Sequence, residues 1–251
     1  MMEISTSILN SNNRVESVME LNRTNTSYIH IDVMDGKFVS DTQFSVKEIV
    51  AINRITKYPM DVHLMVNDPL MYINELQNMN ISYITFHLEM KKDIKKIIDK
   101  IKNLGYKVGI SIKPGTDINE LVPYLKDIDM VLIMSVEPGL GGQKFLNGTV
   151  NRINELKKII DKDGYNIKIE VDGGINDITI KKLECVDIVV VGSYIVKSDN
   201  YYNRINSLLE SFNNRGKNIK LVKIKKFILN LMFIFCIILL ALIFIKINYA
   251  K

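Results

Sequence analysis

Histidines and aspartates of this chain recur at spacings that could build one chemical site. The sequence holds three histidines, and His30, His63 and His87 each lie at or near the end of a short apolar run. Asp32 follows His30 by two residues, so both side chains lie on one face of a predicted strand. Asp172 ends another such run, in the segment Glu-Val-Asp-Gly-Gly. Imidazole and carboxylate groups together are typical ligands of a divalent transition metal such as Zn²⁺, Fe²⁺, Mn²⁺ or Co²⁺.

Four of these residues form a candidate metal site, namely His30, Asp32, His63 and Asp172. Any one of them alone would more often be a buried polar residue that is hydrogen-bonded to its neighbours. Four such residues that converge favour a metal site. Asp32 and Asp172 also lie on predicted strands that are three apart in a ring of eight, so their carboxylates face each other. A proton on a carbon between them could be removed on one face and replaced on the other. This is the geometry of two-base epimerisation beside a carbonyl, in which a metal stabilises the developing negative charge.

Glycines follow three consecutive predicted strands. Glycine lets backbone N–H groups approach an anion, and the last loops of an α/β barrel commonly bind phosphate. A single glycine pair is usually an ordinary turn, but three sets predict a phosphate site. Its residues are Gly139, Leu140, Gly141, Gly142, Gly173, Gly174, Gly192 and Ser193.

Short apolar runs alternate with segments of helical periodicity as far as residue 212. We interpret eight runs as strands: 4–9, 28–33, 60–65, 83–88, 107–112, 130–136, 167–171 and 188–191. Helices are predicted at 13–24, 45–56, 69–79, 91–104, 117–126, 149–163, 176–184 and 198–212.

Eight strands, each followed by a helix, predict an α/β fold of the (β/α)₈ TIM-barrel type. An open doubly wound sheet is the alternative. A Gly-x-Gly-x-x-Gly segment after the first strand would support the open sheet, and Ser-Ile-Leu-Asn stands there instead. The pattern therefore favours the barrel.

Composition limits the function classes. The chain has 251 residues and a net charge of +5, and five lysines within 217–226 account for the excess. The rest of the chain is neutral, which gives no electrostatic reason to expect nucleic-acid binding. The two cysteines form no metal or disulfide pattern, and the first ten residues contain no secretory signal.

The C-terminal sequence differs in composition from the predicted barrel. The segment 227–245 is apolar apart from Asn230, and as a helix it would be about 28 Å long, close to the ~30 Å of a bilayer core. It predicts one C-terminal transmembrane helix, and the preceding lysines place the barrel in the cytoplasm. We therefore expect a single-pass membrane protein with a barrel at 1–214, a basic linker at 215–226, a membrane helix at 227–245 and a tail at 246–251.

Four segments resemble the signatures of the ribulose-phosphate 3-epimerase family, in the expected order between about residues 3 and 212. They are His-Ile-Asp-Val-Met-Asp-Gly at 30–36, Asp-Val-His-Leu-Met at 61–65, Met-Ser-Val-Glu-Pro-Gly-Leu-Gly-Gly-Gln-Lys-Phe at 134–145 and Glu-Val-Asp-Gly-Gly at 170–174. Two positions depart from the family pattern: Thr6 replaces a proline, and Ser40-Asp41 replaces Pro-Asn in a loop expected over the site.

The resemblance implies a role for each matching residue. Asp32 and Asp172 would be the acid–base pair, and the four residues of the candidate metal site would be metal ligands. Ser7 and His63 resemble the family's sugar contacts, and the glycine segments resemble its phosphate and substrate cradle. Three methionines match its ring of sulfurs beneath the reacting carbon: Met34, Met65 and Met134.

The implied reaction converts D-ribulose 5-phosphate to D-xylulose 5-phosphate in the pentose phosphate pathway, with one divalent metal ion. A 3-epimerase of another ketose phosphate, such as allulose 6-phosphate, would share this chemistry. A decarboxylase on a related phosphate-binding barrel is another alternative. Its pattern requires Asp-x-Lys-x-x-Asp at the end of a strand, and Met34 stands in place of the lysine, which argues against it. An inactive membrane-tethered scaffold is a further alternative. The expected partners are a phosphorylated ketose and a membrane, with no nucleic acid, and a homo-oligomer is left open.

Overall fold

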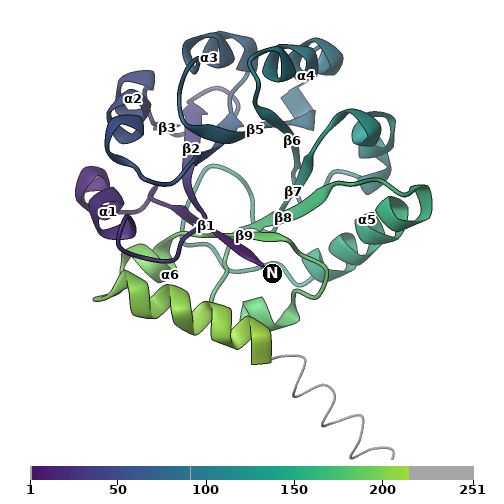
Figure 1. The fold of residues 1–251 in the computed structure, drawn as a ribbon. Helices are drawn as coiled ribbons and strands as arrows, with labels where there is room; N and C mark the ends of the chain where they lie inside the picture. Colours follow the sequence, from purple (N-terminus) through teal and green to yellow (C-terminus); the bar gives the residue numbers. More distant parts are fainter. Residues whose placement is uncertain (1, 91, 215–251) are drawn as a thin grey trace, which may run out of the picture.

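The protein, as a computed structural model, is described for residues 2–90 and 92–214. Eight parallel strands close into a ring at its centre (Figure 1). They are β1 (Glu3–Ser7), β2 (Tyr28–Asp35), β4 (Met60–Met65), β5 (Ile81–His87), β6 (Lys107–Ile112), β7 (Met130–Met134), β8 (Lys168–Asp172) and β9 (Ile188–Val191). Pairing of β1 with both β2 and β9 closes the ring. The predicted TIM barrel is therefore confirmed.

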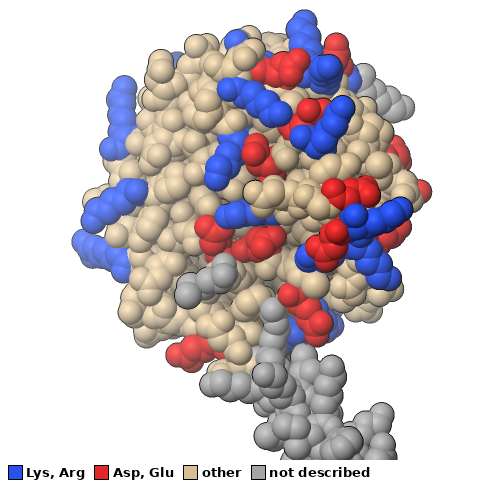
Figure 2. Space-filling view, turned by 45° about the vertical axis from the view of Figure 1, so that its right-hand side comes forward, with Lys and Arg blue, Asp and Glu red and all other residues tan. Residues whose placement is uncertain are grey.

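Helices surround the ring (Figure 1). The α-helices are α1 (Arg14–Leu21), α2 (Val46–Ile55), α3 (Pro69–Glu75), α4 (Ile94–Asn103), α5 (Thr149–Asp163) and α6 (Ser193–Val196), with a further helical segment at 201–214. The 3₁₀ helices are η1 (Leu88–Met90), η2 (Ile118–Asp127) and η3 (Thr179–Lys182). Helix α4 buries four isoleucines and leaves its lysines on the outside. On the face drawn in Figure 2, Lys and Arg lie among Asp and Glu toward the top and right, whereas the charged side chains seen at the left edge are only Lys and Arg.

Several elements differ from the prediction for local physical reasons. The predicted helix 117–126 is the 3₁₀ element η2, because Pro123 lacks the N–H that an α-helix needs there. The predicted helix 176–184 shortens to η3, since the side chain of Asn176 accepts hydrogen bonds from the backbone N–H of Ile178 and Thr179. A two-residue strand, β3 (Thr42–Gln43), pairs antiparallel with β2 and was not predicted.

Side chains inside the ring lie in levels, because alternate residues of each strand point inward. The odd-numbered β2 residues 29, 31 and 33 pack outward in the core beneath the helices. The even-numbered ones point inward. From the amino end of the strands upward, the inner levels contain Tyr28 with Tyr83, then His30 beside Asp61, then Asp32 beside His63, then Met34 beside Met65.

The predicted membrane localisation is wrong for the part of the chain that the structure describes. No helix there is long and apolar enough to cross a bilayer. The 15-residue α5 would span about 22 Å, short of the ~30 Å needed, and like its neighbours it keeps one polar face. The predicted membrane helix 227–245, the basic linker from 215 and the tail 246–251 lie outside the described residues.

Candidate active site

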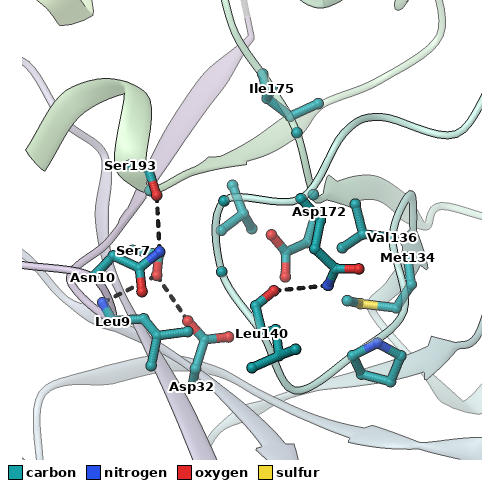
Figure 3. A pocket seen from close by; sticks show the side chains of 18 of the residues that line it. Ser7, Leu9, Asn10, Asp32, Met134, Val136, Leu140, Asp172, Ile175 and Ser193 are labelled. Carbon is teal, nitrogen blue, oxygen red and sulfur yellow. Dashed lines mark hydrogen bonds between the residues drawn. The ribbon is translucent and has the colours of Figure 1, made fainter. Parts of the chain in front are cut away.

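A cavity of about 560 Å³ opens at the carboxyl ends of the strands (Figure 3). This is the end of a TIM barrel at which loops build active sites. His30 and His63 are fully buried and do not line the cavity, which places them behind Asp32. The other predicted site residues all line it: Ser7, Asp32, Met34, Met65, Met134, Gly139, Leu140, Gly141, Gly142, Asp172, Gly173, Gly174, Gly192 and Ser193.

The four residues of the candidate metal site converge. One ligand atom from each of His30, Asp32, His63 and Asp172 lies within 4.8 Å of the others. Strand register causes this, since Asp32 on β2 lies beside His63 on β4. His30 Nε2 is 3.3 Å and His63 Nδ1 is 3.5 Å from Asp32 Oδ1.

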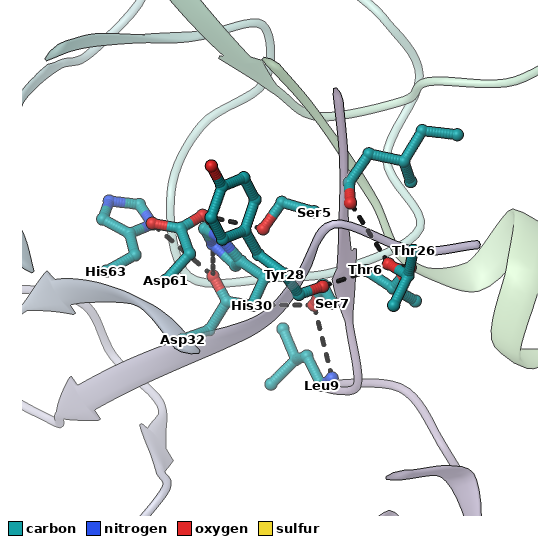
Figure 4. A network of polar contacts seen from close by, with 11 residues as sticks. Ser5, Thr6, Ser7, Leu9, Thr26, Tyr28, His30, Asp32, Asp61 and His63 are labelled. Carbon is teal, nitrogen blue, oxygen red and sulfur yellow. Dashed lines mark hydrogen bonds and ion pairs between the residues drawn. The ribbon is translucent and has the colours of Figure 1, made fainter. Parts of the chain in front are cut away.

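Both imidazoles present an unpartnered nitrogen to this point. His30 Nε2 and His63 Nδ1 are buried and make no hydrogen bond to any residue that the structure describes. Their other nitrogens are engaged: His30 Nδ1 lies 2.7 Å from Asp61 Oδ2, which also accepts from Ser5 Oγ (Figure 4). Buried polar atoms without partners are rare, and a carboxylate behind a histidine is the usual support of a metal ligand. These residues therefore fit a divalent transition metal.

The two carboxylates of the site differ electrostatically. Burial opposes the charge of Asp32, but the adjacent His30 outweighs it and lowers the pKa of Asp32 well below its usual range. Burial and the nearby carboxylate of Asp32 raise the pKa of Asp172 to about 7. Burial also opposes a charge on His30, yet Asp32 and Asp61 raise its pKa well above the ordinary value. One carboxylate is thus an anion where the other readily holds a proton.

Ser7 holds the second oxygen of Asp32. Its Oγ donates to Asp32 Oδ2 at 2.8 Å and accepts from the backbone N–H of Leu9 at 3.3 Å. Figure 3 shows Asp172 projecting into the cavity on the side opposite Asp32. The space between them can therefore take a small substrate with one carboxylate on each face.

Glycine is required in the loop after β8, where it packs against the loop after β7. A Cβ at Gly174, whose φ is +63°, would lie 2.3 Å from the backbone nitrogen of Phe145. A Cβ at Gly173, at φ +120°, would lie 2.5 Å from Val136. This part of the cavity wall is consequently bare backbone, which lets an anion approach main-chain N–H groups.

The chain matches the model of the ribulose-phosphate 3 epimerase family over residues 3–196. It is 34% identical over 215 residues to the ribulose-phosphate 3-epimerase of Methanocaldococcus jannaschii, covering 84% of this chain and 91% of the relative. It is 33% identical to the chloroplastic ribulose-5-phosphate-3-epimerase of Arabidopsis thaliana, covering 83% of this chain and 76% of that one. The chain belongs to the ribulose-phosphate 3-epimerase family. It is an epimerase, an isomerase that acts on carbohydrates.

More distant structures share the fold alone. KGPDC from Streptococcus mutans superposes with a TM-score of 0.65 at 12% identity, covering 85% of the epimerase and 98% of that chain. N-(5'-phosphoribosyl)anthranilate isomerase from Pyrococcus furiosus gives a TM-score of 0.55 at 16% identity, covering 87% and 100%. At these identities the superpositions show that the barrel fold is shared, and they do not show a shared activity.

Two residues of the epimerase site were not predicted. Asp61 supports His30, and it lies two residues before His63 on the predicted strand 60–65, so alternation puts both side chains on one face and could have identified it. Asn10 lines the cavity and donates from Nδ2 to Ser193 Oγ at 2.8 Å. A Cβ at Gly141 would lie 2.2 Å from this Asn10 nitrogen, so the asparagine fills the space that the glycine leaves. Its position just after β1 was the available signal.

Proposed function

We propose that this epimerase inverts the configuration at C3 of a ketose phosphate, converting D-ribulose 5-phosphate to D-xylulose 5-phosphate in the pentose phosphate pathway. One observation carries the proposal above the others. Two carboxylates, the buried Asp32 and the half-buried Asp172, converge on one cavity with pKa values displaced in opposite directions. A base and an acid on opposite faces of one carbon are what a two-base epimerisation requires.

The proposed reaction begins with Asp32 as the carboxylate. Asp32 takes the proton from C3 on its side, the electron pair of the C–H bond forms a C2=C3 double bond, and the π pair of the C2 carbonyl moves onto its oxygen to give an enediolate; this pair returns to the carbonyl when C3 is protonated again. Asp172, as the carboxylic acid, then donates its proton to C3 on the opposite face. The reverse reaction exchanges the two roles. Ser7, which donates to Asp32 Oδ2, orients this carboxylate and is proposed to contact the sugar.

A divalent cation, Zn²⁺, Fe²⁺, Mn²⁺ or Co²⁺, would be held by His30, Asp32, His63 and Asp172. When bound, it would act as a Lewis acid that stabilises negative charge on the substrate oxygens next to C3. The unpartnered nitrogens of His30 and His63 support this assignment. A sugar contact for His63 stays a prediction, since its ring lies behind the cavity wall.

The remaining wall residues would bind the two ends of the substrate. The phosphate is proposed to bind the backbone of the glycine segments, Gly139–Gly142, Gly173, Gly174 and Gly192, with Ser193. Met34, Met65 and Met134 line the cavity as a soft apolar wall, which would limit access of water to the carbanion-like intermediate.

Turnover by the purified full chain tests the proposal. The chain, supplied with Zn²⁺, Fe²⁺, Mn²⁺ or Co²⁺ in turn, is assayed on D-ribulose 5-phosphate and, in parallel, on D-allulose 6-phosphate. We expect a higher kcat/KM on ribulose 5-phosphate. A preference for D-allulose 6-phosphate would overturn the substrate assignment but not the two-base mechanism. If neither substrate is epimerised with any of these metals, the proposal is rejected.

A further inference from the structure

A buried chain of polar groups extends from the candidate metal site toward the outer side of β5. His63 Nε2 lies 2.9 Å from His87 Nε2, and His87 Nδ1 lies 3.1 Å from Glu89 Oε2. Both imidazole rings are fully buried. Glu89 lies in η1, directly after β5, so a single segment supplies both residues behind His63.

The far end of this chain fixes its direction. Glu89 Oε1 accepts a hydrogen bond from the backbone N–H of Lys113 at 2.6 Å and another from the hydroxyl of Thr116. A backbone N–H can only donate, so Glu89 acts here as an acceptor. Its pKa is lowered to about 2, so Glu89 is a carboxylate with no proton to donate; its second oxygen therefore also accepts, and the His87 proton lies on Nδ1.

The proton positions follow ring by ring. A buried neutral imidazole carries one N–H, so His87 with its proton on Nδ1 has a bare Nε2 that can only accept. His63 must then donate from Nε2, which leaves His63 Nδ1 without a proton. That nitrogen is the atom that faces Asp32 Oδ1 and makes no hydrogen bond.

We infer that Glu89 and His87 are positioning residues that hold His63 in its Nε2–H tautomer, so that His63 Nδ1 points at the metal site as a free ligand. The inference rests on the metal site of the proposed function. Supporting hydrogen bonds of this kind set the tautomer and orientation of a ligand histidine, and their loss typically weakens metal binding about 10- to 100-fold. Phe38 packs against His87 with ring centroids 4.7 Å apart and the ring planes tilted by 39°, which further restricts the His87 ring.

One isosteric substitution should reverse the donor and acceptor roles in the hydrogen bonds that link Glu89, His87 and His63. In Glu89→Gln the amide oxygen must face the Lys113 N–H, so the amide NH₂ faces His87 Nδ1. His87 would then accept at Nδ1 and carry its proton on Nε2, and His63 would be forced to carry its proton on Nδ1. The ligand nitrogen would be blocked with no change in side-chain size.

Three variants serve as comparisons. His87→Phe keeps an aromatic ring beneath Phe38 and removes both hydrogen bonds. His87→Gln offers an amide oxygen to His63 and an amide N–H to Glu89, so it should restore part of what His87→Phe loses. Glu48→Gln makes the same carboxylate-to-amide change at the start of α2, where Glu48 contacts Arg14 and Ser45 and does not line the cavity.

The test is a ring ¹⁵N NMR spectrum of the full chain labelled at histidine, recorded without metal and with Zn²⁺, together with Zn²⁺ titrations. Since the sequence holds three histidines, each ring can be assigned by substitution. We expect wild-type His87 as the Nδ1–H tautomer and, with Zn²⁺, His63 bound through Nδ1. The Kd for Zn²⁺ should rise about 10- to 100-fold in Glu89→Gln and His87→Phe, less in His87→Gln, and not in Glu48→Gln.

The outcomes separate this inference from the proposed function. A wild-type chain that binds no Zn²⁺ would reject the metal site and the inference together. A wild-type chain that binds Zn²⁺ while His87 carries its proton on Nε2, or while His63 binds through Nε2, would overturn the inference alone. So would wild-type Zn²⁺ affinity in Glu89→Gln, because a protein that binds the ion as tightly as wild type is folded around the site. The wild-type spectra decide the matter even if a variant fails to fold.

Discussion

Asp32 uses its two carboxylate oxygens for different purposes. Oδ1 faces His30 Nε2 and His63 Nδ1, and Oδ2 accepts from Ser7. Asp172, on β8, shares the cavity and has its pKa raised to about 7 by burial and by Asp32. Two carboxyl groups of similar chemistry thus acquire different charge states from their surroundings, which is how one site can hold both an acid and a base.

Amide substitution of either carboxylate should remove the reaction. Asp32→Asn and Asp172→Asn are each expected to lower kcat by about 10²- to 10⁴-fold, because a carboxamide neither accepts nor donates the C3 proton. Steady-state rates on ribulose 5-phosphate measure this. Asp93→Asn is a matched control, since Asp93 caps the exposed start of α4 and asparagine is an equally good cap. More than about a hundredth of the wild-type rate in both site variants would contradict the assigned roles.

Glu89 should add a pH-dependent contribution to stability. Burial opposes its ionisation, but hydrogen bonds from His87 and Thr116 outweigh burial and lower the pKa of Glu89 to about 2. A lowered pKa stabilises the folded protein above the unfolded pKa of about 4.3, and the contribution decreases as pH falls toward 2. We expect the free energy of unfolding of wild type to lose ~0.6 kcal/mol more than that of Glu89→Gln between pH 6 and pH 4.

Urea titrations of the metal-free proteins at these two pH values provide the measurement. Metal-free protein is needed because acid also releases a bound metal. Parallel loss of stability in the two proteins would show that Glu89 is ionised no more readily when folded than when unfolded.

Alternation along strands was enough to place most site residues from the sequence. It put His30 with Asp32, and it put His63 with Asp61, on common faces. It did not show that Asp61 supports His30 or that His87 contacts His63, because these contacts depend on the register between neighbouring strands. Register is set by pairing across the sheet, and it has no local signature in the sequence.

At the scale of elements, the interior of the ring is packed tightly enough that one methyl group matters. Gly109 on β6 lies beside Thr85 on β5, and a Cβ at Gly109 would be 2.2 Å from Thr85 Oγ1. Thr85 Oγ1 is buried and makes no hydrogen bond among the described residues. The glycine is therefore required by its neighbour, not by its backbone conformation.

Gly109→Ala should lower the free energy of unfolding by about 1–3 kcal/mol, because the added methyl overpacks the ring. Thr85→Ala removes the opposing atoms without leaving a partner unpaired. The double variant should consequently be more stable than Gly109→Ala alone. Thermal and urea unfolding of the three proteins measure the effect, and additive losses in the double variant would argue against the contact.

Sequence periodicity predicted the strands better than the helices. The strands are buried on both faces, so continuous apolar runs mark them clearly. The outer elements η2 and η3 departed from regular helix because Pro123 and the side chain of Asn176 redirect local hydrogen bonds. Strand β3 is two residues long, too short for any period to be visible.

At the scale of the whole molecule, order of elements and family motifs agree on one barrel with its site at the carboxyl ends of the strands. Hydropathy alone led to a membrane localisation, whereas no helix among the described residues is long and apolar enough to cross a bilayer. A hydropathy run reports composition, whereas the barrel prediction drew on eight repeated elements together with motifs in a fixed order. Independent local signals that agree carry more information than a single strong one.

Metal removal should lower both the activity and the stability of the fold. We expect chelated protein to lose activity and to regain it with Zn²⁺, Fe²⁺, Mn²⁺ or Co²⁺. Because the ligands come from β2, β4 and β8, a bound ion should also stabilise the fold, by about 2.7 kcal/mol at a free metal concentration of 100 times Kd. Differential scanning calorimetry with and without metal measures this. Full activity in protein shown by elemental analysis to be metal-free would contradict the assignment.

The most direct test of the two-base account is solvent exchange in Asp172→Asn. Ribulose 5-phosphate is incubated with this variant, loaded with metal, in D₂O, and the recovered sugar phosphates are examined by NMR and mass spectrometry. Asp32 alone can remove the C3 proton and return a deuteron to the same face. The account predicts deuterium at C3 of recovered ribulose 5-phosphate without formation of xylulose 5-phosphate. Xylulose 5-phosphate formed at near the wild-type rate would contradict it, because Asp172 would then not be the second acid.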